Sequence, residues 1–342
     1  RLFISPMPMA SNKAGRRAPR DSAEARILAI KLTDAVLGGR AISAAINRST
    51  QENCSVTPIP AIQPSRAGIC NPLLQPLIVP DMRKGMNLAQ LLSDIQPGVD
   101  THRITIPSTW HQGRTAYGGL SSALAYQAAK SVAPDLPPLL TAQIAFSGPL
   151  SGEVEISSQI LRRGRNSAFV KSEIAIGDEI GLSCTFVFMA RRESHVDFEG
   201  LPRPEFPPIP EDGQTRSGPP EFFTHNMDYP DKRLVLGEGK PRLANWHRLK
   251  ERDGLDPVAD LLCMGDALPP STMGLMKKEG MISSINWQVN FLTDVPETDN
   301  GWWFLESETH HAVHGASSQY MTVWNSRGEP MMTGMQAVAL FV

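Results

Sequence analysis

The sequence predicts an α+β protein built from two tandem units, each with one central helix and a long antiparallel sheet. A stretch from the middle of the chain is repeated at its end: GRNSAFVKSEIAIGDEIGLSCTFVFMA begins at Gly164, and GASSQYMTVWNSRGEPMMTGMQAVALF begins at Gly315. Each copy has a second glycine 13 positions after the first, at Gly177 and Gly328, and is typical of a strand, a turn and a strand. A helical pattern precedes each copy, which indicates two similar folding units.

Length and composition agree with two domains of ordinary size. The chain has 342 residues, of which 41% are hydrophobic, enough for two buried cores. No stretch approaches the roughly 18 to 20 uninterrupted apolar residues of a membrane helix, so we expect no membrane span. The four cysteines form no CxxC pair and no disulfide framework, which is typical of a reducing compartment, and we expect a cytoplasmic protein.

The net charge of −2 conceals an asymmetry along the chain. Residues 1–85 carry 12 Lys or Arg against 5 Asp or Glu, whereas the rest of the chain carries 21 against 30. A moderately acidic body gives no electrostatic reason to expect nucleic acid as a partner.

Residues 1–85 are expected to be a disordered or spurious extension without chemistry of their own. Scattered prolines interrupt any periodicity after Asn53, and the composition is typical of disorder. An organelle-targeting presequence is the alternative, because such segments are rich in Arg and Ser and poor in acids.

The N-terminal unit is predicted over residues 86–192. It begins with a short helix over 87–95. Gly118 and Gly119 precede a second helix over 120–132, whose many Ala and Ser residues allow close packing against a sheet. Strands are predicted over residues 101–106, 139–147, 152–162, 167–177 and 180–191.

The C-terminal unit is predicted over residues 221–342, after a linker over 193–220 that is dense in proline and glycine. Its helix is expected over 257–267, where the following Pro269 and Pro270 end it. Strands are predicted over residues 222–236, 241–250, 281–292, 301–311, 316–326 and 330–342.

A helix wrapped by a long antiparallel sheet, present twice in one chain, resembles the double hot-dog fold. The stretches GRTAYGGLSSALAYQAAKSV and SGPLSGEVEISSQILRRGRNSAFVKSEI resemble the type II acyl-CoA thioesterases, the TesB-like family. The likeness covers about residues 86–342. It implies a hydrolase without a cofactor that converts acyl-CoA to a carboxylic acid and coenzyme A. It also implies that the two sheets join within the chain and that whole chains form a homo-oligomer.

The resemblance implies a three-residue site in the second unit: an Asp at the helix, a Thr or Ser on the next strand, and a Gln near the end of the last strand. These fall on Asp266 in LLCMGDALPP, Ser284 in GMISSINWQVNF and Gln336 in MTGMQAVAL. Ser283 is the alternative to Ser284, because a slip of one residue reverses the face of a strand. The repeat places Thr185 over Gln336, so the first unit is expected to be a non-catalytic twin.

The residue types leave two interpretations open at each of these positions. Gln336 stands in an apolar stretch, where a lone polar side chain is either hydrogen-bonded or outward-facing at an edge. Asp266 stands near the end of a helix, where its charge opposes the macrodipole, which favours a functional role over a capping role.

Residues 284–291 alternate, so that one face is expected to carry Ser284, Asn286, Gln288 and Asn290. This is the pattern of an ordinary half-exposed strand. It is also a row of hydrogen-bonding groups that could orient a polar substrate, with Asn286 among them.

Hydrolysis of a thioester needs an activated water and a donor for the developing oxyanion. Under the resemblance, Asp266 acts as general base, and Ser284 and Gln336 hold the water. A backbone N–H near the Gly118–Gly119 turn is expected to receive the oxyanion. No covalent acyl-enzyme is required.

Arg162, Arg163 and Arg165 surround Gly164 and are candidates for binding the phosphates of coenzyme A. A solvated basic turn is the alternative. We expect no metal site at His310, His311 and His314, because adjacent strand residues point to opposite faces and zinc needs three or four supported ligands.

Other enzyme classes lack support in the sequence. There is no G-x-S-x-G, no P-loop and no G-x-G-x-x-G. Two alternatives remain: a protein that binds acyl-CoA without hydrolysing it, and an enoyl-CoA hydratase. A hydratase requires an Asp and a His at the start of the helix, and the segment Asp253–Asp260 contains no His.

Overall fold

The computed structural model describes residues 85–211, 213–230, 237 and 239–342. The predictions for residues 1–84 lie outside the described residues. Among the helices of the described part, none combines the length and the hydropathy that crossing a bilayer requires.

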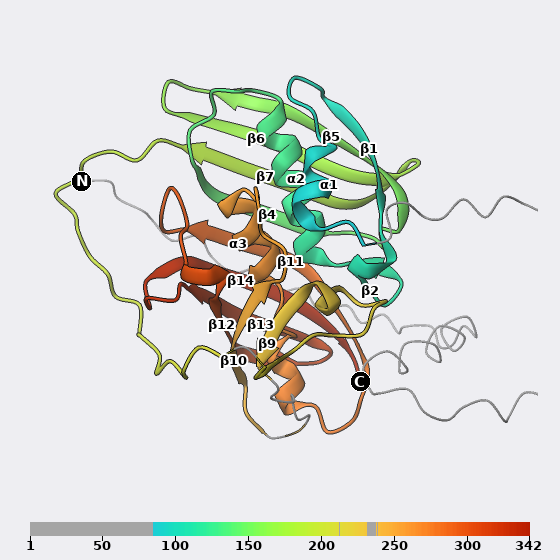
Figure 1. The fold of residues 1–342 in the computed structure, drawn as a ribbon, viewed down its shortest axis with the longest axis vertical. Helices are drawn as coiled ribbons and strands as arrows, with labels where there is room; N and C mark the ends of the chain where they lie inside the picture. The colour runs from blue at the N-terminus through green and yellow to red at the C-terminus, as the bar shows by residue number, and fades with distance from the viewer. Residues whose placement is uncertain (1–84, 212, 231–236, 238) are drawn as a thin grey trace, which may run out of the picture.

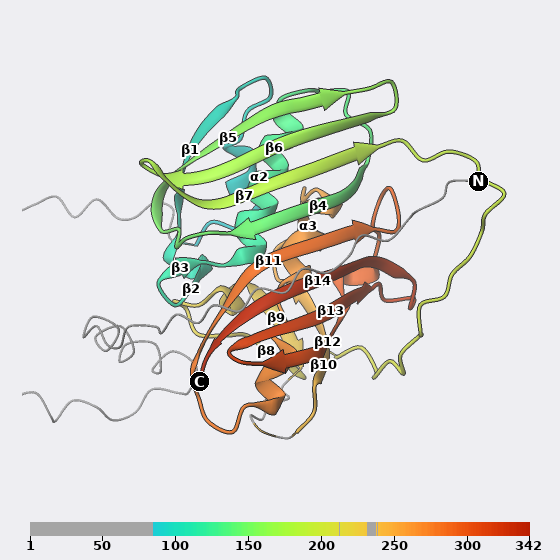
Figure 2. The same ribbon diagram turned by 180° about the vertical axis from the view of Figure 1, so that it is seen from behind.

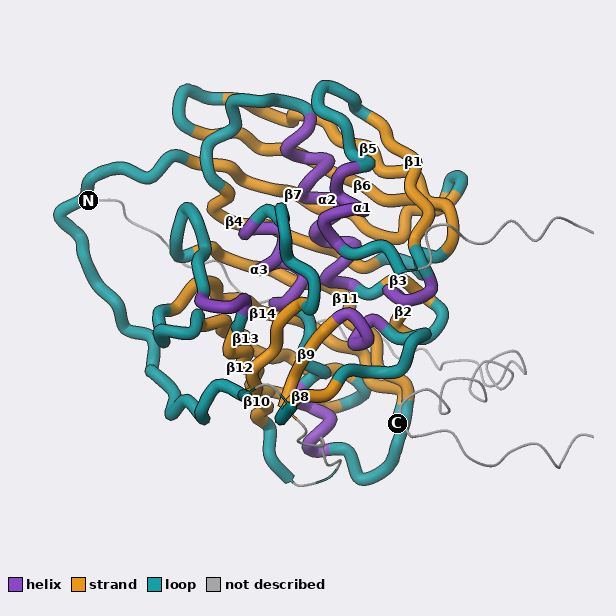
Figure 3. Tube along the Cα trace, in the orientation of Figure 1, coloured by secondary structure: helices purple, strands orange, loops and turns teal. Residues whose placement is uncertain are grey.

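Twelve strands form one sheet in the order β1-β5-β6-β7-β4-β11-β14-β13-β12-β10-β9-β8, as the view from behind shows (Figure 2). The helices pack on the other side of this sheet (Figures 1 and 3). The two units meet where β4 pairs antiparallel with β11, with Gln143 opposite Gln288. This is the double hot-dog arrangement expected from the sequence, because the sheets of the two units join edge to edge within one chain.

The N-terminal unit contains all the elements that the sequence predicts, most of them within two residues of the predicted ends. Its helices are α1 (Leu88–Ser93) and α2 (Gly118–Ser131). Its strands are β1 (Thr101–Ile106), β2 (His111–Gln112), β3 (Thr115–Ala116), β4 (Leu139–Phe146), β5 (Gly152–Arg163), β6 (Ser167–Ile176) and β7 (Glu179–Met189).

In its described residues the C-terminal unit has one α-helix, α3 (Pro257–Gly265), and a short 3-10 helix, η6 (Ser271–Leu275), after it. The strand predicted over 222–236 is represented by a 3-10 turn at Phe223–Asn226 followed by β9; residues 231–236 lie outside the described residues. The strands are β8 (Thr215–Arg216), β9 (Met227–Pro230), β10 (Arg242–Leu249), β11 (Met281–Phe291), β12 (Trp303–Val313), β13 (Ala316–Trp324) and β14 (Pro330–Phe341).

The helix α2 lies against β5, β6 and β7 because its side chains are small. Ala123, Ala125, Ala128 and Ala129 are all fully buried. Burial of these methyl groups stabilises the unit by excluding water, while their size lets the helix approach the strands closely.

The helix α3 begins at a strong capping sequence. The side chain of Asp256 accepts hydrogen bonds from the backbone N–H groups of Val258 and Ala259, at 2.9 and 3.1 Å. Pro257 occupies the first helical position, where its missing N–H costs no hydrogen bond. The cap fixes where α3 starts, and Asp266 is the C-cap residue at its other end.

The segment predicted as a linker runs round the edge of the molecule in Figure 1 and packs on the outer face of the sheet at β10, β12 and β13. Phe206 packs against Trp246, Phe304 and Trp324, with ring centroids 5.1 to 6.2 Å apart. The indole N–H of Trp246 donates to the carbonyl of Pro207 at 2.8 Å. The segment is therefore anchored to the sheet although it is almost free of regular structure.

The expected alternation of β11 is wrong at one point, because the strand contains a β-bulge between Ser284 and Asn286. Ser284 lies opposite Val338 and Asn286 opposite Ala337, and neighbouring residues of β14 face opposite sides of the sheet. The bulge therefore turns Ser284 to the helix side, and leaves Ile285, 48% exposed, at the surface.

The repeat forms the pairs β6–β7 and β13–β14, but the expected match of Thr185 with Gln336 is wrong. Thr185 lies opposite Lys171 and is only partly buried, whereas Gln336 lies opposite Gln319 on the core side. The two hairpins have register shifts at different places, so the aligned sequences slip relative to the sheet faces. The core-facing side chains of β7 are Leu182, Cys184, Phe186 and Phe188.

Candidate active site

Asp266 lies where the two units touch. It is the C-cap residue of α3, and its side chain reaches the first turn of α2, the helix of the other unit. The backbone N–H of Gly119 donates a hydrogen bond to its carboxylate. The side-chain amide of Gln336 on β14 donates a second one, with 2.9 Å between Nε2 and Oδ1. The structure thus brings together Asp266 and Gln336, two of the predicted site residues, with the predicted glycine pair.

Helix dipoles explain why the carboxylate is tolerated there. The C-terminal end of α3 disfavours a negative charge, whereas the N-terminal end of α2 favours it and offers unpaired N–H groups. The residue that precedes α2, Tyr117, makes no side-chain cap to this turn. Asp266 therefore acts as an acceptor for the start of α2, supplied from the other unit.

The pKa of Asp266 lies near neutral pH. Burial raises the pKa of Asp266 to about 7, although the hydrogen bonds from Gln336 and Gly119 favour the ionised form and lower it. A carboxyl with a pKa in this range is a stronger base than an ordinary aspartate and is still ionised in a large fraction of molecules at neutral pH. This is the property that a general base requires.

The glycine pair is required because of close approach. A Cβ at Gly119 would lie 2.4 Å from the carbonyl oxygen of Cys263 and 2.6 Å from the ring of Tyr117. A Cβ at Gly118 would lie 2.6 Å from Oδ2 of Asp266 and 3.0 Å from Phe146. The sequence predicts these glycines just before the helix, but they form its first turn, which the end of α3 can approach only if side chains are absent.

Tyr117 stabilises the contact between α2 and α3. Its hydroxyl donates to the carbonyl of Cys263, in the last turn of α3, at 2.6 Å. Burial and the charge of Asp266 raise the pKa of Tyr117, so the phenol keeps the proton that it donates. Its ring stacks on Phe223 with centroids 3.9 Å apart. One side chain therefore satisfies a helix-end carbonyl and seals the junction of the units.

Ser284 lies on the same face of the sheet as Gln336. It pairs with Val338, and Gln336 is the previous residue of β14 on that face. Ser283 lies opposite Ala339, is exposed, and points to the other face. Of the two serines that the sequence left open, only Ser284 is on the side of Asp266.

The structure does not bring the other predicted binding residues to this site. Asn286 is exposed on the outer face, where its Oδ1 accepts from the backbone N–H of Ala337 at 3.1 Å. Arg163 and Arg165 line a small hollow of about 170 Å³ beyond the C-terminal end of α2, and Arg163 forms an ion pair with Asp135 at 2.7 Å. The helix separates this hollow from Gly118 by about 20 Å.

The histidines lie on β12 and the turn that follows it. His310 packs on Tyr320 with ring centroids 4.5 Å apart, at the surface. Among the described residues, no group of three or more His, Cys, Asp or Glu is arranged to hold a metal ion.

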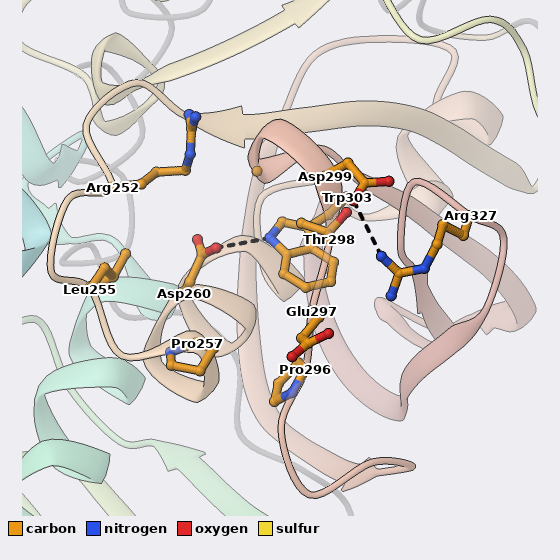
Figure 4. Close-up of a pocket in the computed structure, with 11 residues that line it drawn as sticks. Arg252, Leu255, Pro257, Asp260, Pro296, Glu297, Thr298, Asp299, Trp303 and Arg327 are labelled. Carbon is orange, nitrogen blue, oxygen red and sulfur yellow. Dashed lines mark hydrogen bonds and ion pairs between the residues drawn. The ribbon is translucent and has the colours of Figure 1, made fainter.

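A second carboxyl with a raised pKa was not singled out from the sequence. Asp260 on α3 lines a polar pocket of about 360 Å³ together with Arg252, Thr298 and Trp303 (Figure 4). Burial raises the pKa of Asp260 to about 6, against the hydrogen bond from Trp303 and the charge of Arg252. The only sequence signal was an acid inside the apolar run VADLLCM. Asp266, at the opposite end of α3, does not line this pocket.

Comparison with known proteins decides the family. Residues 106–190 match the family model of the acyl-CoA thioesterase N-terminal domain, and residues 201–340 match that of the acyl-CoA thioesterase C-terminal domain. The chain belongs to the acyl-CoA thioesterase family. The resemblance stated from the sequence is therefore confirmed, and the chain is a thioester hydrolase by family.

Solved structures confirm the fold. A hot dog fold protein of unknown function from Alicyclobacillus acidocaldarius has 18% identity and a TM-score of 0.63, covering 75% of this chain and 99% of its own. Acyl-CoA thioesterase II TesB2 from Mycobacterium marinum has 14% identity and a TM-score of 0.56, covering 73% and 96%. A tesB protein from Mycobacterium avium subs paratuberculosis has 17% identity and a TM-score of 0.57, covering 74% and 98%. No curated protein sequence matches the chain.

Proposed function

We propose that this family member hydrolyses acyl-CoA to a carboxylic acid and free coenzyme A, with a water molecule held by Asp266, Gln336 and Ser284. One observation carries the proposal: a carboxyl with a pKa of about 7 is held by a side-chain amide and a helix N-terminus where the two units meet. A base with a pKa near the working pH is suited to taking a proton from water.

The reaction follows from this geometry. Asp266 takes a proton from the water, while the water oxygen bonds to the thioester carbonyl carbon. The carbon–sulfur bond then breaks, the acid is released, and the proton returns from Asp266 to the thiolate of coenzyme A. Gln336 and Ser284 fix the direction of the water, which lowers the entropy cost of the attack.

The first turn of α2 supplies the oxyanion donor in this proposal. Because Gly119 donates to Asp266, we assign the developing charge to the N–H of Gly118, the neighbouring residue of the same turn. The dipole of α2 favours negative charge at this end. The absence of a side chain at Gly118 leaves the backbone accessible to a thioester.

The test is release of free thiol from short, long and aromatic acyl-CoAs by the full chain. We expect turnover of at least one class, and a loss of about 10²- to 10⁴-fold in Asp266→Asn. Asp178→Asn, in an exposed turn, is the matched control and should retain the wild-type rate. Acyl-CoA that binds without any thiol release would contradict the proposal and leave the alternative of a binding protein.

A further inference from the structure

A buried chain of polar side chains continues from Gln336 to the side away from Asp266. Gln319 on β13 lies directly opposite Gln336 on the helix side of the sheet. Its Nε2 donates to Oε1 of Gln336 at 2.8 Å. Its own Oε1 accepts from the backbone N–H of Ser271, the first residue of η6, at 3.0 Å. Gln319 and Gln336 are only 1% and 2% exposed.

The hydrogen bonds in this row of side chains can run in only one donor-to-acceptor direction. A backbone N–H can only donate, so the atom of Gln319 that faces Ser271 must be its oxygen. The NH2 group of Gln319 then faces Gln336 and requires an oxygen there. The NH2 group of Gln336 is consequently directed at Asp266. A flip of Gln319 would oppose two donors at Ser271, which is costly in a buried site.

Ser271, where this row of hydrogen bonds begins, is itself held in place. The hydroxyl of Ser271 also donates to Oε1 of Gln319, at 3.2 Å. The same hydroxyl lies 2.8 Å from that of Thr309 and accepts from that of Ser307 at 3.1 Å. All of these groups are buried. They hold η6 against β12 and β13, so the N–H that sets the direction cannot move independently of the sheet.

We propose that Gln319 is a positioning residue of the thioesterase reaction, which fixes the amide of Gln336 so that its two N–H groups serve Asp266 and the attacking water. Gln319 touches neither water nor substrate and acts only through Gln336. The inference rests on the proposed function, because it assigns a role within that site.

The burial of Gln319 supports a role beyond packing. The core-facing residues that follow it on β13, Met321 and Val323, are apolar, whereas Ser317 before it is a buried hydroxyl. An apolar side chain as long as Gln319 would fill the position without desolvating an amide. The polar residue adds direction to the hydrogen-bond chain, which an apolar residue cannot provide.

The test uses the full chain and the variant Gln319→Met, which keeps length and volume but removes the amide. We expect kcat to fall by about 10- to 100-fold, with KM nearly unchanged, because the amide of Gln336 is then free to turn. The midpoint of the pH profile should move upward, since Asp266 loses a steady donor to its ionised form. In a Gln336→Ala background, Gln319→Met should cause no further loss.

The matched control is Ser317→Ala. Ser317 lies on the same strand and face and accepts from the hydroxyl of Thr272 at 2.9 Å. It is linked to Ser271 only through Thr272 and Thr309, and its hydroxyl bonds neither Gln319 nor Gln336. It should lose stability and keep kcat. Gln319→Asn, whose amide is one methylene too short to reach both partners, is the second variant, in case Gln319→Met does not fold. It should show the same loss and the same pH shift.

Wild-type kcat and pH midpoint in whichever Gln319 variant folds would overturn the inference, and so would additive losses in the double variant. An equal loss of kcat in Ser317→Ala would also overturn it, since a structural effect would then explain both. Wild type and Asp266→Asn are measured in parallel. A wild type without turnover contradicts the proposed function, whereas an active wild type with an unaffected Gln319 variant contradicts only the positioning role.

Discussion

Gly119 and Asp266 lie 147 positions apart in the sequence and in different units, yet the backbone N–H of one donates to the carboxylate of the other. The bond joins the start of α2 to the end of α3. Neither unit contains both partners. A site that depends on this bond therefore requires both units in one chain, which gives a physical reason for the tandem arrangement.

Gly119→Ala should disrupt this junction. The added Cβ would lie 2.4 Å from the carbonyl oxygen of Cys263, so α2 and α3 must move apart. Overpacking of this kind costs about 1 to 3 kcal/mol in the free energy of unfolding. We expect that loss in urea unfolding, together with a large fall in thiol release because Asp266 loses its donor. Gly164→Ala, whose Cβ would meet nothing nearer than 3.4 Å, is the control and should be close to neutral in both measurements. Equal stability of the two variants would contradict the packing argument.

Ser284→Ala should lower kcat, because the bulge of β11 turns Ser284 to the face of Gln336. Loss of one hydrogen bond to a reacting water corresponds to about 0.5 to 1.5 kcal/mol, or about 2- to 10-fold in rate. Ser283→Ala, on the outer face, should leave the rate unchanged. Steady-state kinetics of the two variants checks the assignment, and a larger effect at Ser283 would show that the register is wrong.

The raised pKa of Asp266 should also make the free energy of unfolding depend on pH. Its value of about 7 in the folded chain lies above the ordinary 3.8, so the native state binds more protons than the unfolded state between these pH values. This contribution to stability is complete below the lower value and is lost as pH rises to about 7. Relative to Asp266→Asn, wild type should therefore lose about 2 to 3 kcal/mol in the free energy of unfolding between pH 5 and 8.

Urea unfolding of both proteins at the two pH values measures this difference directly. The titration of Asp260 is present in both proteins and cancels in the comparison. A pH-independent difference would mean that Asp266 has an ordinary pKa.

Local patterns in the sequence were enough to predict most elements of the fold. The small residues of α2 predicted one helix, and the prolines that flank α3 predicted the other. The repeated hairpin predicted the last two strands of each unit. The bulge at Ser284 could not be predicted, because it is a property of the pairing of β11 with β14 and leaves the alternation of residues 284–291 unchanged in the sequence. The match of Thr185 with Gln336 was wrong for the same reason, because the register shifts of the two hairpins are also a property of strand pairing.

The site was predicted only in part for a related reason. The family resemblance implied Asp266 and Gln336, whereas their residue types alone left a structural interpretation open as well. The bond of Asp266 to Gly119 joins separate units, which no local pattern records. Arg163 was a candidate for binding phosphate, and its ion pair with Asp135 could not be foreseen from the sequence. Gln319 gave one weak signal, an amide on the buried face of a strand, and only its hydrogen-bond partners show how that amide is oriented.

The measurement that tests the account most directly is the pH dependence of kcat/KM for thiol release, for wild type and Asp266→Asn. We expect the wild-type rate to rise with pH through a single midpoint of about 7 and to level off above it, because only ionised Asp266 accepts the proton. Asp266→Asn should lie far below wild type, without this midpoint. A wild-type profile without a midpoint near neutrality, or a variant that keeps both the rate and the midpoint, would contradict the role of Asp266 as the base.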